Sequence, residues 1–62
     1  MTFYKVLAEG KNGEDDITVY EKYEKFAVNP TYEIVVSRNG IAHLAFPTAK
    51  TTWKKKFRQF TE

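Results

Sequence analysis

The chain has 62 residues, a formal net charge of +2 and no cysteine. This length allows one domain only, residues 1–62, and the missing cysteines exclude disulfides and thiolate metal sites. Its ten aromatic residues must therefore supply much of the core, unless the chain associates with itself to gain stability. No stretch is apolar enough for a membrane span or a signal peptide, and we expect a complete, cytoplasmic chain.

The charge is divided unevenly along the chain. Residues 1–33 contain four lysines and seven acidic residues, a net charge of −3. Residues 34–62 contain six basic residues and one acidic residue, a net charge of +5. A basic half of this kind indicates an anionic partner, although two ordinary solvated surfaces would have the same composition.

The first predicted element is a strand at residues 2–8, where apolar side chains alternate over both faces. Residues 10–14 contain two glycines and an asparagine, which predicts a loop.

Residues 15–27 fit two structures, a helix or a strand. A helix is favoured, because Asp15 or Asp16 would cap it and several aromatic residues would share one face. A strand is the alternative, since residues 17–20 are rich in β-branched side chains, but the charged pairs that follow break the alternation.

Residues 32–46 predict two strands joined by a two-residue turn at Asn39 and Gly40. Asn-Gly is the preferred pair for a type I′ turn, in which both residues have positive φ. With Arg38 and Ile41 flanking the turn, the pairs that follow by counting are Ser37 with Ala42, Val36 with His43, Val35 with Leu44, Ile34 with Ala45 and Glu33 with Phe46.

The last predicted element is a helix. Pro47 is expected to end the preceding strand, and Thr51 or Thr52 can cap the helix that follows. Three aromatic residues at helical spacing would face the core: Trp53, Phe57 and Phe60. The predicted fold class is therefore α+β, a small three-stranded antiparallel sheet with two helices in the order β-α-β-β-α. If residues 15–27 form a strand, the alternative is a small all-β barrel of four to five strands.

The residue types needed for catalysis are sparse, and we expect neither an enzyme nor a bound cofactor. His43 lies mid-strand with no serine or carboxylate at a suggestive spacing, so a structural role is expected. The acidic residues at 14–16 lack the alternating oxygen ligands of a calcium loop, which predicts no metal site.

The segment at residues 50–58 is the strongest functional signal. It combines cations with aromatic residues, the composition of surfaces that contact phosphates and stack on bases. We therefore predict a small non-catalytic nucleic-acid-binding domain, for DNA or RNA. The predicted contact residues are Lys50, Trp53, Lys54, Lys55, Lys56 and Arg58. The simpler interpretation is that the aromatic residues face the core and the lysines are solvated.

The alternative is a protein-binding module, an inhibitor or adaptor of the kind found in bacteria and phages. Its partner would be a larger protein. Tyrosines are enriched in protein interfaces, and the candidate residues are Tyr20, Tyr23 and Tyr32. An exposed strand edge would be a second route to such binding.

Overall fold

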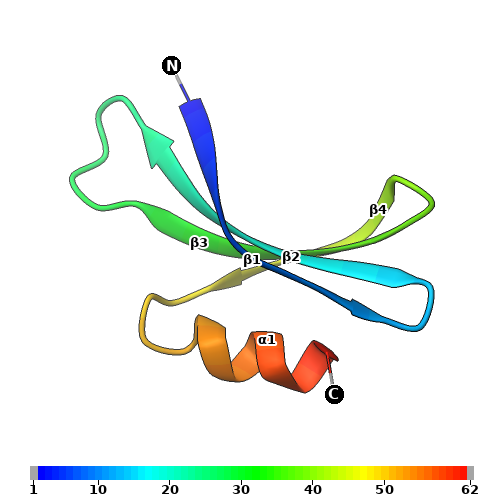
Figure 1. Cartoon of the computed structure of the whole chain (residues 1–62). Coiled ribbons are helices and arrows are strands. Elements are labelled where there is room, and N and C mark those ends of the chain that lie inside the picture. Colours follow the sequence, from blue (N-terminus) through cyan, green and yellow to red (C-terminus); the bar gives the residue numbers. More distant parts are fainter. Residues whose placement is uncertain (1, 62) are drawn as a thin grey trace.

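The structure is a computed structural model that describes residues 2–61. It contains four strands and one helix: β1 (Thr2–Asn12), β2 (Asp15–Glu24), β3 (Thr31–Arg38), β4 (Ile41–Thr48) and α1 (Trp53–Thr61). The strands form one antiparallel sheet in the order β1-β2-β3-β4. This sheet is strongly twisted, and α1 crosses one of its faces (Figure 1).

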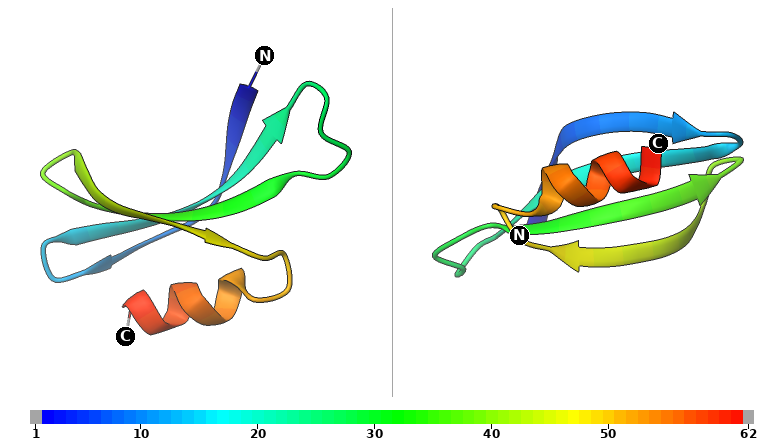
Figure 2. Two further views of the ribbon diagram at one scale, coloured as in Figure 1. Left: turned by 180° about the vertical axis from the view of Figure 1, so that it is seen from behind. Right: turned by 90° about the horizontal axis from the view of Figure 1, so that it is seen from below.

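The core lies between α1 and the two central strands. Four β-branched residues are buried there: Ile17, Val19, Ile34 and Val36. They are alternate residues of β2 and β3, as the two-residue period of a strand requires. The helix contributes three partly buried aromatic residues: Trp53, Phe57 and Phe60. Seen from below, α1 lies over the middle of the sheet, between the edge strands (Figure 2).

Strand β1 is longer than predicted and includes most of the expected loop. Only Gly13 and Glu14 separate it from β2, and Gly13 has a φ of 65°. Gly10 lies within the strand, where a Cβ atom would be 2.8 Å from Thr61 Cγ2 and 3.0 Å from Phe57 Cζ. Glycine at position 10 therefore lets α1 lie close to the sheet, rather than forming a loop.

The predicted helix at residues 15–27 is wrong, because residues 15–24 form β2. Ile17 and Val19 are 2% and 0% exposed, and β2 pairs with β1 on one side and β3 on the other. Phe26, which lies within the predicted helix, is 90% exposed in the connection to β3. The sequence of this segment fits both the helical and the strand period. Its pairing with a strand on each side selects the strand.

The turn at Asn39 and Gly40 is confirmed. Their φ values are 55° and 79°, and Arg38 pairs with Ile41 across the turn. Beyond Ser37 and Ala42, which pair as predicted, the predicted register is wrong. His43 is an extra residue in β4, so the observed pairs are Val36 with Leu44, Val35 with Ala45, Ile34 with Phe46 and Glu33 with Pro47.

This bulge changes which residues of β4 face the helix. Leu44 and Phe46 lie on the same face as Ile34 and Val36, and Phe46 stacks on Phe60 with ring centroids 5.5 Å apart. A bulge has no strong local sequence signal, so counting from the turn could not reveal it. Pro47 does not end the strand, because proline is tolerated in an edge strand.

The predicted fold class is wrong in both strand and helix number. The sheet has four strands rather than three, and one helix covers it rather than two. The barrel alternative correctly makes residues 15–24 a strand, but the sheet does not close into a barrel. The sheet order leaves β1 and β4 as edges, and the C-terminal segment is a helix that packs on one face.

Candidate nucleic-acid interface

The solvent side of α1 is basic. Trp53, Phe57 and Phe60 take the inner side, which leaves four exposed cations on the rest of the helix: Lys54, Lys55, Lys56 and Arg58. We call these four residues the basic helix surface. No acidic residue lies in the first turn of α1. Four of the six predicted nucleic-acid contacts are therefore accessible on a single element.

Trp53 is also a predicted contact, but it is half-buried against the core cluster. Lys54 Nζ lies 5.7 Å from the centroid of its ring, so this lysine covers part of the indole. The geometry assigns Trp53 mainly to packing. This placement matches the simpler interpretation of the sequence, in which the aromatic residues of the helix face the core.

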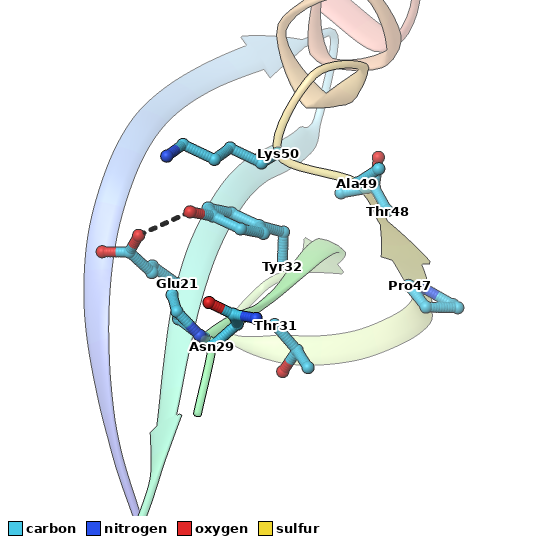
Figure 3. A pocket seen from close by; sticks show the side chains of 9 residues that line it. Glu21, Asn29, Thr31, Tyr32, Pro47, Thr48, Ala49 and Lys50 are labelled. Carbon is cyan, nitrogen blue, oxygen red and sulfur yellow. Dashed lines mark hydrogen bonds between the residues drawn. The ribbon is translucent and has the colours of Figure 1, made fainter. Parts of the chain in front are cut away.

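Lys50 belongs to the loop between β4 and α1, and it is exposed. It lines an open pocket between this loop and the loop that joins β2 to β3. Figure 3 shows its side chain lying across Tyr32 and extending toward the Glu21 side of the pocket. Lys50 thus extends the positive charge of α1 onto the part of the sheet that the helix does not cover.

Two tyrosine hydroxyls converge on one carboxylate in this pocket region. The Tyr23 hydroxyl donates to Glu21 Oε1, and the Tyr32 hydroxyl donates to Glu21 Oε2 at 2.7 Å. These hydrogen bonds lower the pKa of Glu21 below its usual 4.5, and the nearby charges of Lys5 and Lys50 lower it further. The same hydrogen bonds raise the pKa values of Tyr23 and Tyr32 above their usual 10.0.

The three tyrosines of the protein-binding alternative do not form one surface. Tyr23 and Tyr32 lie on the helix side of the sheet around Glu21, and Tyr32 is only 8% exposed. Tyr20 lies on the opposite face, where its ring meets that of Tyr4 edge-on at 5.8 Å. The sequence could not separate them, because the segment that holds Tyr20 and Tyr23 was predicted to be helical.

An exposed aromatic pair was missed by the sequence reasoning. Phe3 of β1 pairs with Tyr23 of β2, and their rings stack with centroids 5.0 Å apart and an interplanar angle of 15°. Phe3 is 59% exposed. This pair could have been predicted from the register of β1 against β2. That register requires residues 15–24 to be a strand.

The acidic residues at 14–16 and His43 are the other positions that the sequence raised as candidates. Within residues 2–61, no group of three or more histidine and acidic side chains could hold a metal ion. The acidic residues near the first turn contact cations instead: Asp15 binds Arg38 at 2.9 Å, and Asp16 lies 3.9 Å from Lys11. His43 is exposed on β4. None of the helices in this part of the chain is long and apolar enough to cross a membrane.

Comparisons with known proteins add no functional information, because no protein-family model, curated protein or solved structure matches this chain.

Proposed function

We propose that this chain is a small, non-catalytic nucleic-acid-binding domain that contacts phosphates through Lys50 and the basic helix surface. The observation that carries this proposal is the placement of three lysines in the first turn of α1. The helix dipole gives this end of a helix a partial positive charge, so lysines here oppose helix stability. A polyanion removes that repulsion, because it binds the same cations and the same end of the dipole.

The distribution of ion pairs supports the proposal. Among residues 2–61 the three ion pairs all lie within the sheet, between Lys11 and Asp16, Lys22 and Glu24, and Arg38 and Asp15. None of the ion pairs within this part of the chain involves a cation of the basic helix surface. The charge of these cations is therefore available to an external anion, and the attraction is weakened only by the screening of dissolved salt.

Binding of this kind depends on phosphates and carries little sequence information. Each phosphate that a lysine or arginine neutralises releases condensed counterions, so the affinity falls steeply with salt. With Lys50 and the four cations of α1, we expect contacts to about three to five phosphates. The slope of log K against log salt concentration should then be about −2 to −4.5.

The test is fluorescence anisotropy with labelled DNA and RNA at low salt, on the wild type and on a variant with Lys54→Gln, Lys55→Gln and Lys56→Gln. Glutamine keeps a high helix propensity, so α1 should still form. We expect the variant to bind at least about tenfold more weakly, with a salt slope smaller by about 2 to 3.

The matched control changes Lys11, Lys22 and Lys25 to Gln. Both triple variants lower the formal net charge from +2 to −1, so only the position of the lost charge differs. The control should keep most of the affinity. Equal losses in the two variants would mean that net charge alone drives binding, and no binding by the wild type would reject the proposal.

A protein-binding module is the second candidate, and one observation favours it. The face of the sheet opposite α1 exposes Tyr4 and Val6 by 53% and 48%, beside Tyr20. Binding at that face would depend on Tyr4 and not on the lysines of α1. The strand edges are poorer candidates, because bulges interrupt both β1 and β4 and proline lies in β4.

A further inference from the structure

The stacked pair of Phe3 and Tyr23, which we call the aromatic platform, has one ring face open to solvent. Tyr23 covers one side of the Phe3 ring, at a centroid distance of 5.0 Å. In the sheet formed by residues 2–61, β1 is an edge strand. Because Phe3 is still 59% exposed, the outer side of its ring faces solvent and can accept a further flat ring.

The platform lies on the same face of the sheet as α1. Tyr23 alternates with Glu21, Val19 and Ile17 along β2, and the last two face the helix. The Tyr23 hydroxyl is bound by the Glu21 carboxylate, which also accepts a hydrogen bond from Tyr32. The hydrogen bond to Glu21 holds the Tyr23 ring in one orientation. The Phe3 ring stacked on it is therefore already positioned in the absence of a ligand.

Two lysines lie between the platform and α1. Lys5 pairs with Glu21 across β1 and β2, and Lys50 lines the pocket that contains Glu21 and Tyr32. The start of β1 and the end of β2 rise away from α1, above the end of the molecule where α1 begins (Figures 1 and 2). Cations therefore run from the basic helix surface through Lys50 and Lys5 to the platform.

We propose that this face binds a single strand of nucleic acid, with phosphates along α1, Lys50 and Lys5 and one base stacked on the open side of Phe3. This inference rests on the proposed function and specifies its ligand. Every base has a flat π face, so stacking of this kind is tolerant of sequence and open to both DNA and RNA. The bases of a duplex are already stacked on one another, so a duplex reaches only the cations.

The experiment compares three labelled probes: oligo-dT, oligo-U and a hairpin duplex. Single strands of roughly 12 nucleotides fall within the site sizes of small single-strand-binding folds. The test variant is Phe3→Leu, which removes the ring but keeps an apolar residue at an exposed position. Phe3→Tyr keeps the ring, and Phe26→Leu is the matched control, because Phe26 is 90% exposed in the loop after β2.

We expect Phe3→Leu to weaken binding of the single strands by about 5- to 100-fold, the effect of losing one stacked base. Its duplex affinity and its salt slope should stay at the wild-type values, since no phosphate contact is lost. Phe3→Tyr and Phe26→Leu should bind every probe like the wild type. A loss confined to oligo-dT or to oligo-U would support the inference and identify the strand as DNA or RNA.

Two outcomes overturn the inference, and they differ in what they mean for the proposed function. If Phe3→Leu and Phe26→Leu bind single strands equally well, no base stacks on Phe3. Binding that still depends on Lys54, Lys55 and Lys56 would then leave the phosphate-binding function intact. If the wild type binds none of the three probes, both proposals fail.

Discussion

At the scale of single residues, two positions have roles that depend on neighbours far away in the sequence. Gly10 faces the side chains of Phe57 and Thr61 across the gap between β1 and α1. Glu21 accepts hydrogen bonds from a neighbour in its own strand and from Tyr32 of β3. Each role supports a specific prediction about stability.

Gly10→Val should destabilise the fold by about 1–3 kcal/mol, the usual cost of forcing extra methyl groups into a packed contact. The added Cβ would lie 2.8 Å from Thr61 Cγ2, so the Thr61 side chain or α1 itself must shift. Urea denaturation measures the free energy of unfolding. Lys11→Val is the control, because position 11 is exposed, and it should have little effect. Equal stability of the Gly10→Val variant and the wild type would show that α1 does not pack against β1 in this way.

The Glu21 hydrogen bonds predict a loss of stability at low pH. A carboxyl group with a lowered pKa in the folded state stabilises that state above its ordinary pKa of 4.5. This contribution is lost as the pH falls below that value, because the unfolded chain then binds the proton more readily. On moving from about pH 7 to about pH 3, the urea midpoint of the wild type should fall further than that of Glu21→Gln.

The exposed Glu9→Gln control should respond like the wild type. An identical response of all three proteins would contradict the prediction.

At the scale of elements, the bulge at His43 sets the orientation of β4. With the extra residue, Leu44 and Phe46 face α1 together with Val36 and Ile34. Without it, the regular register predicted from the turn would place His43 and Ala45 there instead. One residue in an edge strand thus decides whether an aromatic ring joins the core.

Deleting His43 should therefore be tolerated. The shortened strand can pair Ser37 with Ala42 and Val36 with Leu44 without a bulge, so we expect a change in the free energy of unfolding below about 1 kcal/mol. Deleting Val35 is the control, because β3 is a central strand and the deletion would turn Ile34 or Val36 away from the core. Circular dichroism and urea denaturation compare the two deletions. If the His43 deletion unfolds the chain as the Val35 deletion should, the bulge is essential to the fold.

At the scale of the whole molecule, the helix supplies the second layer that the sheet requires. The buried residues Ile17, Val19, Ile34 and Val36 pack against the aromatic side chains of α1. A nine-residue helix is too short to be stable alone in water. The sheet and the helix therefore depend on each other, as expected for a domain with a single small core.

Removing residues 50–62 should leave a chain that does not fold. The fragment would expose four buried β-branched side chains at about 25 cal/mol per Å², in a domain whose total stability is only a few kcal/mol. Proton NMR of the fragment should show the narrow dispersion of an unfolded chain. A dispersed spectrum with strand-like shifts would instead show that the sheet is stable without its cover.

The amino-acid sequence by itself determined the local features of this protein. Asn39-Gly40 specifies its turn, because few other residues tolerate positive φ at both positions. The spacing of Trp53, Phe57 and Phe60 specifies the helix and leaves the cations outside. The candidate phosphate contacts of α1 could be predicted for that reason, because they depend on one element only.

Only the tertiary structure decided the features that depend on pairing between distant segments. Residues 15–24 fit a helix or a strand by pattern, and their burial between β1 and β3 selects the strand. The bulge at His43 and the approach of α1 to Gly10 follow from packing, which leaves little trace in the local sequence. The same holds for the aromatic platform. Phe3 and Tyr23 are twenty residues apart, and they meet only because β1 and β2 pair in this register.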